Sequence, residues 1–345
     1  MTLAERALAM AGPAEQRLRP LGFRGAARCS LGDPGGLDDL RAALREALDA
    51  SLTYAGALWY ANLANSLGDF DPTASLATFQ EGIGLAERRG LTEMAMWMRA
   101  GALERRYEVG RWDELLRDAD EVVAWYRAHG PGSFIVAAAE VQTARVLAAR
   151  GQLAKADELV ERCLAVADAA YVERLMTLTV AAVVKQARDQ PAAATRLVEE
   201  FQRSAAGRPQ WGRARHLPDL LRVCTAAGRL DLAAGLLTGL PPAEAADGPE
   251  RRSLLTAEAV VAEARDDAGL AAERYALAAA VWAESGCPLE YGHALLGWGR
   301  CLQRLQRPDA EPKLRQARAR FAELGCRPLL AATDAWLQRA RAAGS

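Results

Sequence analysis

Apolar residues return every three or four positions along most of the chain, and Gly, Asp or Pro interrupts the pattern at regular intervals. In the clearest stretch, 134–150 places Val136 and Val141 on one face. After Gly151, 153–168 supplies a second apolar face. This spacing predicts two amphipathic helices. Gly151 between them can adopt the left-handed conformation that ends the first helix.

The same helix–turn–helix unit repeats about every 39 residues. The predicted turns are Leu31-Gly32-Asp33, Leu67-Gly68-Asp69, Val109-Gly110-Arg111, Arg150-Gly151-Gln152, Asp189-Gln190-Pro191, Ala227-Gly228-Arg229, Asp266-Asp267-Ala268 and Gln306-Arg307-Pro308. A fixed period of this length is typical of repeat proteins, in which stacked helix pairs bury one another's apolar faces. The sequence therefore predicts an all-α, right-handed α-solenoid of about eight helix pairs.

The helix boundaries follow from the turns. The expected pairs are 14–31 with 36–50, 53–68 with 72–89, 91–109 with 111–129, 134–150 with 153–168, 171–189 with 192–206, 213–227 with 230–239, 250–266 with 269–285, and 289–305 with 309–324. A further helix over 327–342 is expected to cap the last apolar face. The whole chain, 1–345, is predicted to be one solenoid domain. Residues 240–250, with three prolines, form a candidate soft point within it.

Composition limits the classes of partner. The net charge is −1, so no overall electrostatic attraction to nucleic acid or to an anionic membrane is expected. No apolar stretch is long enough to span a membrane, and the first 19 residues carry charges where a signal peptide needs an apolar run. Six scattered cysteines without a CxxC pair suit free, buried thiols in a reducing compartment. The expected location is the cytoplasm.

Residues that carry chemistry are sparse. The three histidines fall in three different repeats, and neither a zinc-binding spacing nor a phosphate-binding loop occurs. No nucleophile elbow is present. We therefore expect no enzymatic activity, no cofactor and no metal, and we expect the protein to work by binding.

The short unit, with small residues where its two helices meet, resembles the tetratricopeptide repeat. Ala144, Gly151, Ala156 and Cys163 stand at the small-residue and turn positions, although the period exceeds that repeat's length of about 34 residues. The resemblance implies a concave groove lined by first helices, at positions 13, 10, 6 and 3 residues before each turn glycine. The candidate binding residues on this basis are Asn62, Asn65, Trp97, Glu104, Tyr107, Arg145, Arg215, Arg222 and Arg300. Arginines with amides and aromatics suit an acidic peptide or a carboxylate. Arginine is abundant here, so ordinary exposed helix residues are the competing interpretation.

Several segments resemble a particular family. They are Leu21-Gly22-Phe23-Arg24-Gly25-Ala26-Ala27-Arg28, Leu85-Ala86-Glu87-Arg88-Arg89-Gly90-Leu91, Gly110-Arg111-Trp112-Asp113-Glu114-Leu115-Leu116 and Ala319-Arg320-Phe321-Ala322-Glu323-Leu324-Gly325-Cys326. Together they are similar to the C-terminal helical-repeat region of large actinobacterial signalling ATPases, namely cyclase-linked AAA proteins and LuxR-type ATP-dependent transcriptional regulators. The resemblance implies a regulatory module that senses an effector or binds a protein, with ATPase and output domains upstream in the same polypeptide or locus. No phosphate-binding loop occurs here, so no ATPase residue is carried over.

Two other functions remain open from the sequence. One is a stand-alone receptor that binds a short peptide in the groove. The other is an enzyme, or an accessory of one, whose site forms in the groove.

Overall fold

The structure, a computed structural model, describes residues 14–130, 133–166, 171–206, 212–246 and 248–343. The helix pairs are α2 (Ala14–Ser30) with α3 (Gly36–Asp49), α4 (Thr53–Phe70) with α5 (Pro72–Arg88), α6 (Thr92–Glu108) with α7 (Trp112–His129), α8 (Ser133–Ala149) with α9 (Leu153–Leu164), α10 (Tyr171–Ala187) with α11 (Pro191–Ala205), α12 (Leu217–Ala226) with α13 (Leu230–Leu237), α14 (Gly248–Ala264) with α15 (Ala268–Glu284), and α16 (Pro288–Arg304) with α17 (Ala310–Leu324). A final helix, α18 (Arg327–Ala343), follows the eighth pair. Two short 3₁₀ helices, η1 (Ala214–His216) and η2 (Ala243–Ala245), precede α12 and α14.

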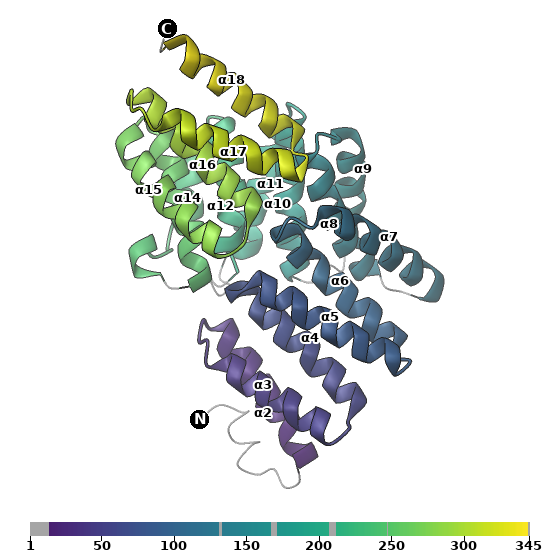
Figure 1. Cartoon of the computed structure of the whole chain (residues 1–345). Helices are drawn as coiled ribbons and strands as arrows, with labels where there is room; N and C mark the ends of the chain where they lie inside the picture. Colours follow the sequence, from purple (N-terminus) through teal and green to yellow (C-terminus); the bar gives the residue numbers. More distant parts are fainter. Residues whose placement is uncertain (1–13, 131–132, 167–170, 207–211, 247, 344–345) are drawn as a thin grey trace.

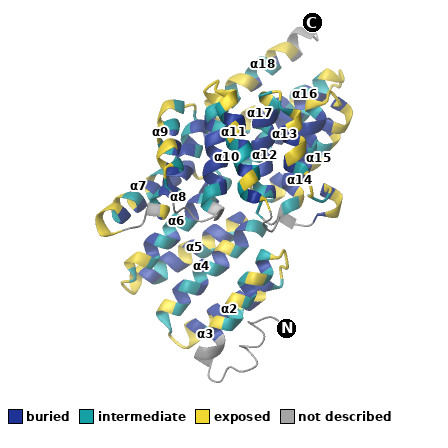
Figure 2. Cartoon of the chain, turned by 180° about the vertical axis from the view of Figure 1, so that it is seen from behind, coloured by how far each residue is buried: buried dark blue, intermediate teal, exposed yellow. Residues whose placement is uncertain are grey.

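These elements confirm the predicted all-α solenoid of eight helix pairs with one further C-terminal helix (Figure 1). Each helix packs against its successor, and alternate helices such as α8 and α10 also touch. One cluster of buried apolar side chains extends from Met96 to Leu337. It includes Ala243 and Ala246, so the described part of the proline-rich 240–250 segment is packed against the stack. Figure 2 shows the burial concentrated in the middle of the stack, around α10 and α12.

Seven of the eight turns within pairs share one backbone conformation. The residue that ends the first helix has a positive φ; these residues are Gly32, Gly110, Gly151, Asp189, Gly228, Asp266 and Gln306. The next N–H then reaches back to a carbonyl five residues earlier, as from Arg111 to Arg106 at 2.8 Å and from Asp267 to Ala262 at 3.0 Å. This bond satisfies a carbonyl that the helix end would otherwise leave free. The repeat is thus fixed at the turn by conformation more than by residue type.

The predicted turn at Gly68 is wrong. Helix α4 continues to Phe70, and the boundary falls at Asp71, whose side chain accepts a hydrogen bond from the Ala74 N–H at 2.9 Å. Asp71 lies 39 residues after Gly32 and 39 before Gly110, so the corrected boundary makes the period more regular. Gly68 is instead an interior helix position, where an added Cβ would lie 2.3 Å from Nη1 of Arg105.

The solenoid coils tightly enough for early and late repeats to touch. Helix α4 contacts α14, and α8 contacts α18. At the turn after α6, a Cβ on Gly110 would lie 2.8 Å from Leu324 and 2.9 Å from Pro288. The inner faces of the first helices therefore look into an interior that the coil closes from both sides.

Candidate functional site

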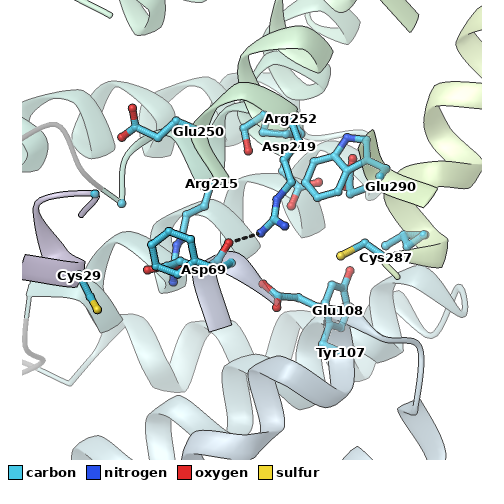
Figure 3. A pocket seen from close by; sticks show the side chains of 18 of the residues that line it. Cys29, Asp69, Tyr107, Glu108, Arg215, Asp219, Glu250, Arg252, Cys287 and Glu290 are labelled. Atoms are coloured by element: carbon cyan, nitrogen blue, oxygen red, sulfur yellow. Dashed lines mark hydrogen bonds and ion pairs between the residues drawn. The ribbon is translucent and has the colours of Figure 1, made fainter. Parts of the chain in front are cut away.

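Two neighbouring cavities occupy the interior of the coil. The larger cavity, of about 660 Å³, is lined by Cys29, Ser30, Leu31, Gly32, Pro34, Asp69, Phe70, Tyr107, Glu108, Arg145, Gly212, Ala214, Arg215, Pro218, Asp219, Glu250, Arg252, Ser253, Trp282, Cys287, Leu289 and Glu290 (Figure 3). The smaller cavity, of about 450 Å³, is lined by Ala26, Cys29, Ser30, Asn62, Asn65, Ser66, Asp69, Phe79, Trp97, Ala100, Gly101, Glu104, Arg105, Phe134, Ile135, Ala138, Val141, Gln142, Glu173, Met176, Thr177 and Arg215. Both volumes lie in the range of small-molecule sites.

The cavities share a wall that is built around Arg215. Its guanidinium forms an ion pair with Asp69, 146 positions away, and a second with Glu104 at 3.2 Å. From α14, Nη2 of Arg252 donates a hydrogen bond to the backbone carbonyl of Asp69 at 3.2 Å. These contacts tie the second repeat to the sixth and seventh, and so hold the coil closed.

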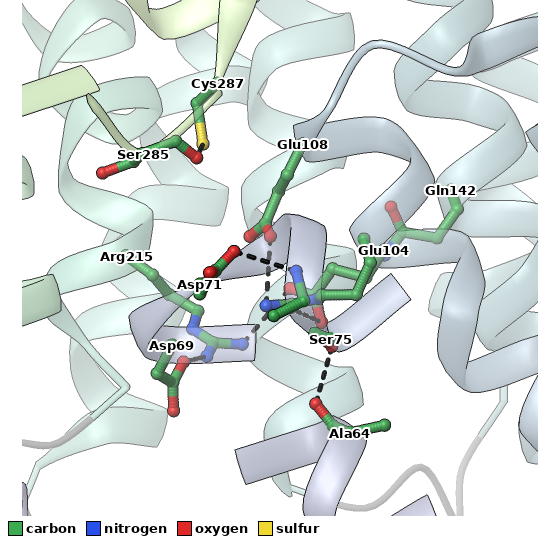
Figure 4. A network of polar contacts seen from close by, with 12 residues as sticks. Ala64, Asp69, Asp71, Ser75, Glu104, Glu108, Gln142, Arg215, Ser285 and Cys287 are labelled. Carbon is green, nitrogen blue, oxygen red and sulfur yellow. Dashed lines mark hydrogen bonds and ion pairs between the residues drawn. The ribbon is translucent and has the colours of Figure 1, made fainter. Parts of the chain in front are cut away.

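A second buried guanidinium lies behind this wall. Arg105 forms ion pairs with Glu104 at 2.7 Å and with Glu108 at 3.0 Å (Figure 4). Burial disfavours a charged Glu104, but the guanidiniums of Arg105, Arg215 and Arg145 together hold its pKa well below the usual range. Burial and the neighbouring Glu104 carboxylate raise the pKa of Glu108. The two acids next to Arg105 are therefore driven in opposite directions.

The far end of the larger cavity holds another ion-paired cluster. Arg222 donates to both carboxylate oxygens of Glu290 and, at 3.2 Å, to Asp219. Burial and the charge of Glu290 raise the pKa of Asp219. Arg222 itself does not line either cavity, because its guanidinium is consumed by these two acids.

Two guanidiniums of the larger cavity have no carboxylate partner among the described residues. Arg145 stacks over the ring of Tyr107, with Cζ 3.7 Å from the ring centroid, and donates to Gln142 at 3.1 Å. Arg252 lies over Trp282 at 5.1 Å in addition to its bond to the Asp69 carbonyl. A guanidinium over an aromatic face keeps its hydrogen-bond donors free at its edge.

The smaller cavity presents amides and aromatic rings. Asn62 and Asn65 enter from α4, Trp97 from α6 and Gln142 from α8. The Asn62 amide donates to the Leu58 carbonyl at 2.8 Å, which fixes its orientation. This mixture of apolar walls with a few polar groups is typical of sites for organic ligands.

The structure brings seven of the nine candidate residues to these cavities. Asn62, Asn65, Trp97 and Glu104 line the smaller one, Tyr107 and Arg145 the larger one, and Arg215 both. Arg222 and Arg300 line neither. Arg300 is held by Glu263 through two hydrogen bonds of 2.9 and 2.7 Å. The binding role of the candidates stays a prediction, but Arg215, Arg222 and Arg300 already have carboxylate partners within the chain.

Three glutamates that face the interior escaped the sequence analysis. Glu173, Glu250 and Glu290 each lie 16 residues before the left-handed residue of their own repeat. That position is one helical turn before the 13-residue position that the tetratricopeptide pattern supplies. Extending the periodic positions by one turn, and applying them to turns closed by Asp or Gln, would have found all three.

No protein-family model matches this chain, and no curated protein matches it. One matching solved structure is described as a circular tandem repeat protein with novel repeat topology and enhanced subunit contact surfaces. The match covers 98% of this chain and 86% of that one, with 13% sequence identity and a TM-score of 0.22. A TM-score this low says nothing about function, so the resemblance to actinobacterial regulators stays a prediction.

Two searches of the described residues returned nothing. No helix there has the length and apolar character to cross a bilayer. No group of three or more His, Cys, Asp or Glu side chains in that part of the chain is placed to hold a metal ion.

Proposed function

We propose that this chain is a non-catalytic effector-binding module, the regulatory repeat region of an ATPase-type signalling or transcription regulator, and that its effector is a small molecule. The observation that carries the proposal is the closed interior. Arg215 and Arg252 tie α4 to the sixth and seventh repeats and divide the interior into two cavities. A long extended peptide does not fit such compartments, whereas a drug-sized molecule does.

The chemistry of the buried side chains supports binding over catalysis. Burial raises the pKa of the thiols of Cys163, Cys224, Cys287, Cys301 and Cys326 to about 12, so they are poor nucleophiles at neutral pH. Burial and nearby guanidiniums lower the pKa of His216 and His293 to about 3. Proton transfer near neutral pH is most effective from groups with a pKa close to 7.

Closure also gives the module a way to report its ligand. A molecule that fits the closed coil better than an open one favours closure by the difference in its affinity for the two states. The ion pair of Arg215 with Asp69 lies between the cavities and across the closure, so it is the contact that such a ligand would reinforce. The upstream ATPase would respond to the resulting change in the spacing of the repeats.

The test is recovery of a bound small molecule. The protein is purified from its native cytoplasm and heated, and the released compounds are identified by mass spectrometry. Ser30→Trp places a large ring where the cavities meet, and Ala138→Trp fills the smaller one; both are expected to lose the compound. Ala27→Trp adds the same ring on the exposed face of α2 and is expected to keep it. A compound retained equally by all four proteins would show that it does not occupy the interior.

A second experiment tests the regulatory assignment. Proteins that co-purify with the chain from the same cytoplasm are identified, and the proposal expects a polypeptide with an ATPase module among them. Recovery of a short peptide in place of a small molecule would favour the stand-alone peptide receptor.

A further inference from the structure

The smaller cavity contains a carboxylate without a partner. Glu173 lies in the first turn of α10 and lines the cavity. Its Oε2 is buried and accepts no hydrogen bond from the described residues. The adjacent Arg174 is not available, because it is engaged by Glu200 and by the Leu164 carbonyl. A carboxylate removed from water without a donor is costly, so a donor from a bound molecule would be favourable here.

The remaining charges of the smaller cavity neutralise one another. Glu104 is paired with Arg105 and Arg215, and Asp69 is paired with Arg215. Arg105 is also shared with Glu108 from the neighbouring cavity. Glu173 is therefore the negative charge of this cavity that no guanidinium offsets. A ligand with a complementary positive group would balance it.

Aromatic rings and amides complete the lining. Phe79 from α5, Trp97 from α6 and Phe134 from α8 border the same space. Aromatic faces attract cations and also cover apolar ligand atoms. The side chains of Asn65 and Gln142 add neutral hydrogen-bonding groups beside the rings.

We propose that the smaller cavity binds a small organic cation, an amine or guanidinium carried on an apolar or aromatic body, and that Glu173 accepts its N–H groups. This inference rests on the proposed function, since it names the chemical class of the effector. Glu173 recognises the cationic group, and Trp97 and Phe79 contact the body.

A helix start offers a different reason for the glutamate. Acidic side chains in the first turn of a helix are stabilised by the helix dipole, and Glu250 and Glu290 occupy equivalent positions in α14 and α16. Glu250 also has no ion-pair partner among the described residues, but it faces the larger cavity. Glu250 is therefore a matched control, because Glu250→Gln removes the same charge from the same position of a different repeat.

The experiment uses a matched set of probes. Tryptamine, tryptophol and indole-3-acetate share one ring system and differ in carrying a positive, neutral or negative group, and agmatine supplies a guanidinium without the ring. Binding to the whole chain is measured by calorimetric titration. At least one of the two cations is expected to bind more tightly than the alcohol and the acid. Glu173→Gln is expected to weaken that binding about 10- to 100-fold, the usual effect of one charged hydrogen bond, and Glu250→Gln to leave it unchanged.

Three results would overturn the inference: binding of the alcohol or the acid as tightly as the cations, cation binding that Glu173→Gln leaves intact, or no binding by any of the four probes. Ala138→Trp fills the cavity without changing its charge and is expected to abolish cation binding, so it tests location independently of Glu173. The compound recovered from native cytoplasm separates the two proposals. A neutral or anionic compound that Ala138→Trp excludes would refute the cation and leave the effector-binding function standing, whereas recovery of no compound would refute that function.

Discussion

The two cavities share a wall but use their charged side chains differently. In the larger cavity, Arg222 is matched with Asp219 and Glu290, and these contacts join helices that lie far apart in the sequence. In the smaller cavity, Glu173 has no partner among the described residues. Charges that are already paired hold the coil together, and a charge left unpaired can select a ligand. The abundance of arginine is thus a poor guide to binding here, because most interior guanidiniums serve closure.

The largest expected effect is the loss of a guanidinium from the shared wall. Arg105→Met leaves Glu104 and Glu108 without their closest cation, and we expect it to lower the free energy of unfolding by about 3 kcal/mol, as breaking a buried ion pair does. Urea denaturation measures this change. Arg41→Met breaks an exposed pair with Asp38 and should change stability by about 0.5 kcal/mol or less. Equal losses in the two variants would mean that the interior pairs do no more than surface pairs.

The space that Arg105 occupies gives the next effect. Gly68→Ala places a methyl group 2.3 Å from Nη1 of Arg105, and the guanidinium cannot move freely because two carboxylates hold it. We expect a loss of about 1–3 kcal/mol, typical of overpacking. Gly84→Ala in α5 meets just the flexible end of Arg88, at 3.1 Å, and should stabilise its helix by about 0.5–1 kcal/mol. Thermal unfolding of both variants decides the matter: a stabilising Gly68→Ala would show that the close approach to Arg105 is unimportant.

Most of the fold could be predicted from the sequence, whereas the site could be predicted in part. The turn signals at Gly32, Gly110 and Gly151 report a local backbone requirement, which one short stretch of sequence encodes. Gly68 misled because the same residue type serves inside a helix where a side chain from another helix needs room. The closure of the coil was out of reach for a similar reason: Arg215 meets Asp69 across 146 positions, and helical periodicity carries no information about such distant partners.

Acidity should weaken the shared wall through His216, which follows Arg215 on η1. The imidazole is buried, its Nδ1 lies 3.0 Å from the Thr179 hydroxyl, and burial and Arg215 lower its pKa to about 3. The unfolded chain takes up this proton near pH 6.5 and the folded protein does not, so stability is full above about pH 6.5 and falls as the pH drops toward 3. The expected slope is about 1.4 kcal/mol per pH unit from this group.

His216→Asn keeps a polar group near Thr179 and removes the titration. Denaturant midpoints measured between pH 7.5 and pH 5 should therefore fall less steeply in the variant than in the parent. His129 provides the control, because its imidazole is exposed and bonded to the Trp125 carbonyl at its own helix end. An unchanged slope in His216→Asn would place the acid sensitivity elsewhere.

The smallest expected effect concerns Arg145, which lines the larger cavity without a carboxylate partner among the described residues. Arg145→Met keeps an apolar side chain over Tyr107 and removes the charge, so stability should fall by about 1 kcal/mol, the usual contribution of a partly buried cation–π contact. Because Arg145 does not line the smaller cavity, tryptamine affinity should stay within about twofold of the parent, a difference of about 0.4 kcal/mol. Titration of the variant beside Glu173→Gln compares the two cavities directly. If Arg145→Met weakens cation binding as much as Glu173→Gln does, the cavities act as one site, and the division at Arg215 does not separate their functions.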